Sequence, residues 1–142
     1  MQTEYDVVVT TADLDALGHV NNARYLNFLE DARMAWYARA GLIERIQPTC
    51  PSATFDTVVV NINIDFNREC RLGERLVIET RPARLGRKSL VLHQVIKKTS
   101  GDLAAEAVVT SVVMNLQSRT TVVLPDSLAV FFDRQAPDAE SS

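Results

Sequence analysis

The spacing of apolar residues changes along the chain, from every third or fourth position to strict alternation. From Asn22 onward, the apolar residues that share one helical face are Tyr25, Leu29, Ala32, Trp36 and Ala40. Asn21 or Asn22 can cap the start of such a helix, and Gly41 can close its end. The pattern predicts one helix of about five turns over residues 22–40.

From Thr54 apolar and polar residues alternate, which is typical of strands with one buried face. The residues predicted to share the buried face of the first long strand are Val58, Val60, Ile62, Ile64 and Phe66. The other predicted strands are Tyr5–Thr10, Arg75–Leu85, Ser89–Lys98 and Leu103–Leu116, with Arg119–Val123 as an extension or an added strand. The separators LGRK and TSGD are too short for parallel crossovers, so these strands are predicted to be antiparallel. Pro82 cannot donate a ladder hydrogen bond and therefore marks an edge or a bulge.

Three segments show neither the helical spacing nor the alternation of a strand. Leu42–Ala53 contains two prolines and is predicted to be irregular, a short helix is predicted from Pro125 to Arg134, and the polar tail Gln135–Ser142 is predicted to be disordered. A helix with one apolar stripe must bury it, and long half-apolar strands can curve around it. We therefore predict an α+β fold in a single domain over residues 1–134.

Composition narrows the classes of partner. A chain of 142 residues can bury one core, and its formal net charge of −3 gives no basic field for nucleic acid. Cys50 and Cys70 match no CxxC or metal-ligand spacing, so we expect free thiols. The N-terminal sequence MQTEYDVVV does not resemble a secretory leader, and no apolar run reaches the roughly 18 residues of a membrane span. We expect a cytoplasmic protein with neither a membrane nor a nucleic acid as partner.

The loop Thr11–Val20, directly before the helix, concentrates polar residues, among them Asp13, Asp15 and His19. A carboxylate can attack a carbonyl carbon or activate water, and a helix N-terminus offers unpaired N–H groups to an oxyanion. The alternative is that both aspartates are turn or capping residues. Gly18 is expected to permit a turn or a close approach of substrate to the backbone.

The run DLDALGHVNNARY from Asp13 to Tyr25, followed by Glu30 and Arg33, resembles the signature of hotdog-fold acyl-CoA thioesterases of the hydroxybenzoyl-CoA thioesterase type. The resemblance extends over about Tyr5 to Leu116. It implies a hotdog fold, in which a five-stranded antiparallel sheet wraps a long central helix. It also implies an acyl-CoA substrate and a homodimer or homotetramer with active sites between subunits. No metal is expected, and no cofactor apart from the CoA of the substrate.

Carried over residue by residue, the resemblance gives Asp15 the role of catalytic carboxylate. Asn22 matches the helix-start position whose backbone N–H polarises the thioester carbonyl. The run HVNN is similar to that of plant acyl-ACP thioesterases, in which the histidine is implicated in catalysis, so His19 is a further candidate. Those enzymes carry an asparagine where this chain has Leu17.

Substrate contacts are predicted from two regions. Asn21 and Tyr25 adjoin the catalytic candidates, although the position of Tyr25 on the apolar helix face equally suits a core residue. Arg87, Lys88 and Ser89 form a basic run that resembles the CoA-contacting region of the family, and a solvated turn is the alternative.

The sequence thus predicts an acyl-CoA thioesterase that releases free acid and CoA. Two alternatives stay open: an acyl-thioester hydratase or dehydratase, for which a carboxylate on the helix such as Glu30 is a candidate, and a non-catalytic acyl-CoA-binding protein. Motifs for serine-triad hydrolysis, nucleotide binding and zinc catalysis are not found in the sequence.

Overall fold

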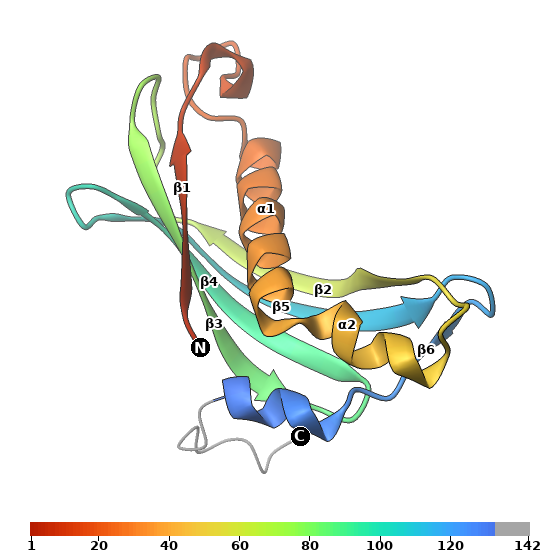
Figure 1. Ribbon diagram of the computed structural model, residues 1–142. Helices are drawn as coiled ribbons and strands as arrows, with labels where there is room; N and C mark the ends of the chain where they lie inside the picture. The colour runs from red at the N-terminus through yellow and green to blue at the C-terminus, as the bar shows by residue number, and fades with distance from the viewer. Residues whose placement is uncertain (133–142) are drawn as a thin grey trace.

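The computed structural model describes residues 1–132, which form one long helix lying across the inner face of a curved antiparallel sheet (Figure 1). Helix α1 spans Asn22–Ala40, and the long strands are β1 (Thr3–Val8), β2 (Phe55–Phe66), β3 (Arg75–Leu85), β4 (Ser89–Lys98) and β5 (Leu103–Asn115). Their order in the sheet is β1-β3-β4-β5-β2, and the two-residue strand β6 (Thr120–Thr121) pairs with β5. The predicted α+β hotdog fold is confirmed.

Both ends of α1 carry the predicted signals. The Asn21 side chain accepts a hydrogen bond from the backbone N–H of Ala23 at 2.9 Å, and Gly41 adopts the left-handed conformation with φ 64°. The apolar face of α1 contributes to two clusters of the core, one around Tyr25 and Leu29 and one around Trp36. A helix buried along one face in this way is held mainly by its packing on the sheet.

The prediction of which β2 side chains are buried is wrong for the first half of the strand. The pairing of β2 with β5 shifts register between Val59 and Asn61, so Val60 is an extra residue of a β-bulge. Val59 pairs with buried Ser111 on the helix side, whereas Val58 lies on the outer side of the sheet. Alternation in the sequence cannot reveal a bulge, because each half of the strand alternates correctly by itself.

Other boundaries differ from the predictions more modestly. The prediction of an irregular Leu42–Ala53 is wrong: α2 covers Leu42–Ile46 and buries both end residues, and a 3-10 helix covers Gln47–Thr49. The 3-10 helix Asp126–Phe131 stands where the terminal helix was predicted, and a further 3-10 helix covers Thr11–Asp13 in the loop before α1. The pairing of β3 with β4 shifts after Pro82, which confirms the bulge expected there. The predicted tail Gln135–Ser142 lies outside the described residues.

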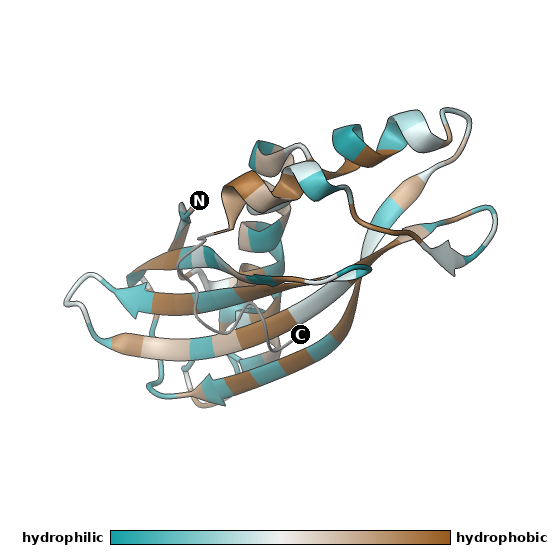
Figure 2. Ribbon diagram, turned by 90° about the horizontal axis from the view of Figure 1, so that it is seen from below, coloured by the Kyte–Doolittle hydropathy of each residue, from teal (hydrophilic) through white to brown (hydrophobic). Residues whose placement is uncertain are grey.

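Bands of apolar and polar residues follow one another along the strands (Figure 2), and successive side chains of a strand point to opposite faces of the sheet. The sheet edges are β1 and β2, so β2 has no neighbouring strand on one side among residues 1–132. The loop before α1 and the connection from β2 to β3 lie together at one end of the sheet, whereas the β3–β4 hairpin lies at the other end (Figure 1).

Candidate active site

The loop before α1 is closed by its own backbone. The N–H of Asp15 donates to the carbonyl of His19 at 2.8 Å, and the N–H of Gly18 donates to the carbonyl of Asp15 at 3.1 Å. Gly18 has φ 80°, and a Cβ added there would meet no atom within 4 Å. The requirement for glycine is therefore conformational, which fits the predicted turn.

The two oxygens of the Asp15 carboxylate have different surroundings. Oδ1 accepts hydrogen bonds from the backbone N–H groups of Leu17 at 2.9 Å and His19 at 3.2 Å, so it fixes the turn. Oδ2 has no hydrogen-bond partner among residues 1–132, and the residue is exposed. The turn role and a chemical role are therefore compatible, because they use different oxygens.

The start of α1 faces the same space. Asn21 uses its side-chain oxygen to cap the helix, and its backbone N–H donates to the carbonyl of Asp13 at 2.9 Å. The backbone N–H of Asn22 is the first of the helix and has no hydrogen-bond partner within the described part of the chain. An unpaired N–H at the positive end of a helix can stabilise a developing oxyanion.

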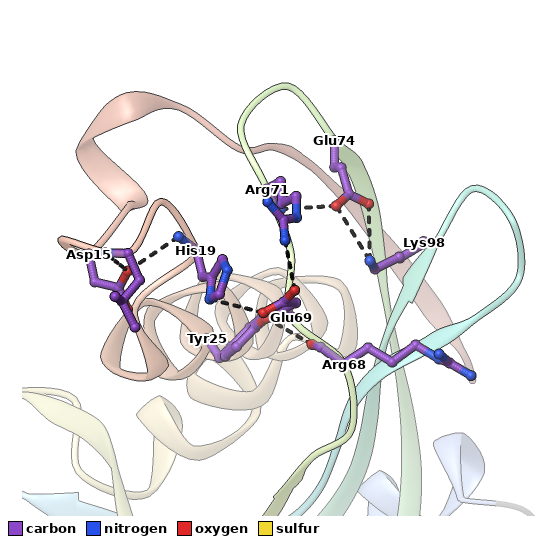
Figure 3. Close-up of polar contacts among 9 residues, drawn as sticks. Asp15, His19, Tyr25, Arg68, Glu69, Arg71, Glu74 and Lys98 are labelled. Atoms are coloured by element: carbon purple, nitrogen blue, oxygen red, sulfur yellow. Dashed lines mark hydrogen bonds and ion pairs between the residues drawn. The ribbon is translucent and has the colours of Figure 1, made fainter.

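His19 meets a residue that the sequence did not single out. Its Nδ1 atom lies 2.9 Å from Oε2 of Glu69, and Oε1 of Glu69 lies 2.9 Å from Nη2 of Arg71 (Figure 3). His19 and Arg71 also form an isolated antiparallel bridge through their backbones. The proton of a neutral imidazole is thereby assigned to Nδ1, and Nε2 is left as the acceptor.

These groups line one cavity of about 200 Å³. Its lining residues are Asp15, His19, Val20, Asn22, Tyr25, Phe66, Asn67, Arg68 and Glu69. Four of them, Asp15, His19, Asn22 and Tyr25, were predicted as site residues, whereas the sequence pointed to none of residues 66–69 as part of the site. Asn21 and Gly18 adjoin the cavity without lining it.

Tyr25 is held firmly in the wall of this cavity. It is 2% exposed, and its hydroxyl donates to the carbonyl of Arg68 at 3.1 Å. Burial, with a smaller effect of the neighbouring Cys70, raises the pKa of Tyr25 well above its usual value. The phenol therefore stays protonated and serves as a wall and a hydrogen-bond donor.

Asp13 is a structural residue, in agreement with the turn or capping role expected as the alternative for the aspartates of this loop. It is 4% exposed, and Oδ1 lies 2.9 Å from both Nε and Nη2 of Arg24. Burial raises the pKa of Asp13, but hydrogen bonds from Thr10 and Arg24 outweigh it, so the pKa lies below its usual value.

The predicted CoA contacts are not part of this cavity. Arg87 and Ser89 line a separate depression together with Arg84, Leu85 and Gly86, and Lys88 is exposed beside it. This hairpin lies at the far end of β3, whose 11 residues span roughly 36 Å. One copy of the chain does not bring the hairpin to Asp15.

Two further observations bear on the chemistry. Glu30 is exposed on α1 and does not line the cavity, so the carboxylate wanted for a hydratase is absent from it. Within residues 1–132 no three His, Cys, Asp or Glu side chains are grouped as metal ligands, and no helix is long and apolar enough to cross a membrane.

Comparison with known proteins settles the family. The model of the thioesterase-like superfamily matches residues 9–132. The chain belongs to the thioesterase-like superfamily. Within this superfamily it is 36% identical to the long-chain acyl-CoA thioesterase FadM of Escherichia coli over 129 residues, which cover 90% of this chain and 93% of FadM.

Solved structures of similar proteins agree with this membership. The probable thioesterase YbaW of Escherichia coli superimposes with a TM-score of 0.70 at 36% identity, covering 92% of this chain and 94% of that one. The SAV2348 protein of Staphylococcus aureus, whose structure is a complex with CoA, superimposes with a TM-score of 0.79 at 18% identity. That alignment covers 92% of this chain and 80% of SAV2348, and at this identity it supports the shared fold alone. The predicted resemblance to hotdog-fold thioesterases is confirmed.

Proposed function

We propose that this protein is an acyl-CoA thioesterase in which Asp15 and the backbone N–H of Asn22 act on the thioester carbonyl. The observation that carries the proposal is that a carboxylate oxygen and an N–H group, neither with a partner in residues 1–132, belong to residues lining one cavity. The 36% identity to a long-chain acyl-CoA thioesterase over most of both chains supports the same reaction.

In the proposed reaction Oδ2 of Asp15 attacks the carbonyl carbon or removes a proton from an attacking water. The carbonyl oxygen becomes negatively charged and accepts a hydrogen bond from the N–H of Asn22 at the positive end of α1. The C–S bond then breaks, and the CoA thiolate takes up a proton. After nucleophilic attack a mixed anhydride would remain, which water hydrolyses to the acid and regenerates Asp15.

His19 is proposed to orient water or to hydrogen-bond the thioester through Nε2. Its Nδ1 contact with Glu69 fixes the ring, in the way that carboxylates orient catalytic histidines in other hydrolases. No metal or cofactor is required by this chemistry, because the chain supplies both the carboxylate and the oxyanion donor. With CoA as part of the substrate and both cysteines free, we place the activity in the cytoplasm.

We further propose a homo-oligomer that pairs through the free edge of β2. This edge strand is 12 residues long and exposes Val59 and Val60, and such edges readily pair with another strand. A second copy is also needed if Arg87, Lys88 and Ser89 are to contact CoA, because within one chain they lie far from Asp15. Sedimentation of the purified protein tests this: a monomer at micromolar concentration would contradict it.

The decisive experiment for the activity is thiol release from a panel of acyl-CoA thioesters by the wild type and Asp15→Asn. Asparagine keeps an oxygen for Leu17 and His19, so the fold should survive while the rate falls by about a thousandfold or more. Full activity of Asp15→Asn would contradict the assignment. Water addition to crotonyl-CoA without thiol release would instead favour a hydratase, and ligand-dependent stabilisation without turnover a binding protein.

A further inference from the structure

Glu69 contacts a different side chain with each of its two carboxylate oxygens. Oε2 lies 2.9 Å from Nδ1 of His19, and Oε1 lies 2.9 Å from Nη2 of Arg71 (Figure 3). Arg71 does not line the cavity, so its side chain acts on the site through Glu69. The carboxylate is therefore shared between a permanent cation and an imidazole that becomes a cation only when it takes up a second proton.

The backbone holds Arg71 beside His19 independently of the arginine side chain. The N–H of Arg71 donates to Oε1 of Glu74 at 2.9 Å, and Arg71 and His19 form an isolated antiparallel bridge. In the same stretch the N–H of Val20 donates to the carbonyl of Cys70 at 2.9 Å. The Arg71 side chain is 62% exposed, so its replacement leaves the core and these backbone contacts in place.

Other charged groups near His19 contribute less to a difference between variants. Oδ1 of Asp15 accepts from the backbone N–H of His19, and this contact is the same whatever residue stands at position 71. The guanidinium of Arg68 points away from His19 (Figure 3). Two further acid–base pairs lie at this end of the sheet, Asp13 with Arg24 and Glu74 with Lys98.

The two groups that Glu69 joins have opposite effects on the imidazole. A carboxylate at hydrogen-bond distance favours the imidazolium, whereas a guanidinium on the far oxygen of that carboxylate offsets part of its negative charge. An imidazolium carries a proton on both nitrogens, so Nε2 can no longer accept a hydrogen bond from a water. Arg71 therefore favours the form of His19 that can act as an acceptor.

We propose that Arg71 is a positioning residue that keeps His19 neutral by offsetting the negative charge of Glu69. Glu69 alone would orient the ring but would also favour its second protonation. With Arg71 in place the ring is oriented and Nε2 stays free to accept. The proposal rests on the proposed thioesterase function, because a free Nε2 matters for turnover only if His19 orients water in that reaction.

The first test follows the imidazole directly by NMR. Glutamine at position 71 can still donate an N–H to Glu69, so Arg71→Gln removes the charge and keeps the contact. We expect the midpoint of the His19 titration to move up by about half a pH unit in Arg71→Gln and down in Glu69→Gln, as expected for unit charges acting through a largely exposed carboxylate. Arg71→Lys should restore the wild-type midpoint. The chain has two histidines, so His93→Gln assigns the signals.

The second test measures kcat/KM for acyl-CoA hydrolysis against pH, which reports groups of the free enzyme. The acid limb of the profile should move in the same direction as the NMR midpoint in each variant. A loss of folding or of shape alone would lower the rate at every pH without displacing the limb. Arg75→Gln is the matched control, because it removes an exposed arginine at the start of β3, and it should move neither the midpoint nor the limb.

The outcomes separate this proposal from the thioesterase assignment. An unmoved His19 midpoint in Arg71→Gln would overturn the role of Arg71 and leave the assignment standing. A midpoint that moves while the acid limb stays in place would also overturn the proposal, since the charge of His19 would then not govern turnover. A wild type that hydrolyses no acyl-CoA would instead refute the proposed function, whereas the NMR titration would still report the charge balance at His19.

Discussion

The Nδ1 atom of His19 and the Oε2 atom of Glu69 lie 2.9 Å apart, although the two residues are far apart in the sequence. His19 belongs to the loop before α1, and Glu69 belongs to the connection between β2 and β3. The side chain of Glu69 is about half exposed, so this pair adds little to the free energy of folding. The contact instead fixes the orientation of the His19 imidazole beside Asp15.

Replacing Glu69 is therefore expected to affect turnover more than stability. Glu69→Ala should lower kcat for acyl-CoA hydrolysis about tenfold with KM nearly unchanged, a fraction of what a positioned acid–base group contributes. Glu69→Gln retains an oxygen for Nδ1 and should keep most of the activity. Steady-state kinetics check this, with Glu44→Ala as the control for loss of an exposed glutamate on α2. Equal kcat values in the wild type and Glu69→Ala would show that His19 needs no such support.

Asp15 should show separable effects on folding and on chemistry. Asp15→Ala removes the Oδ1 atom that accepts from Leu17 and His19, and it should destabilise the protein by about 1 kcal/mol, as loss of a capping or turn side chain does. Asp15→Asn should unfold at nearly the same urea concentration as the wild type. Denaturation followed by circular dichroism measures both, and identical stability of the two variants would contradict the structural role of Oδ1.

The Asp13–Arg24 pair should make stability depend on pH in the acid range. The pKa of Asp13 is lowered by folding, so the pair stabilises the protein above the unfolded pKa of about 3.9, and this contribution is lost as the pH falls further. Asp13→Asn should cost about 2 kcal/mol at neutral pH, less than a fully buried pair because Arg24 is partly exposed.

The difference between wild type and Asp13→Asn should shrink when urea unfolding is repeated well below pH 3.9. Asp31→Asn, an exposed residue of α1, serves as the control and should give no such dependence. A stability difference that does not change with pH would mean that shape, not charge, accounts for the role of Asp13.

The basic hairpin should affect substrate binding but not chemistry. If Arg87 and Lys88 contact the phosphates of CoA, the double alanine variant should raise KM about tenfold at low salt with kcat unchanged, and added salt should reduce the difference. An acyl-pantetheine substrate, which lacks the phosphates, should not distinguish the variant from the wild type. Arg39→Ala tests for a general effect of charge. A similar KM increase for acyl-pantetheine would refute phosphate binding.

The sequence by itself determined those elements that depend on residues close together in the chain. The three-and-four spacing from Tyr25 to Ala40, the capping Asn21 and the terminal Gly41 are sufficient to define α1, because each acts within one or two turns. Short glycine-containing connections likewise fixed the antiparallel pairing of β3, β4 and β5. The run from Asp13 to Tyr25 was enough to identify the family.

Only the tertiary structure decided what lies opposite this run. Glu69 contacts His19, and Phe66 contacts Tyr25, because β2 ends and β3 begins beside the start of α1. No local sequence pattern encodes this placement of the connection. The bulge at Val60 was hidden for a similar reason: it is defined by the partner strand and not by β2 itself. The fold also separates the basic hairpin from Asp15, since antiparallel β3 carries it to the opposite end of the sheet. Local chemistry therefore indicated the loop before α1 as the candidate site, and the long-range pairing of strands determined which residues surround it.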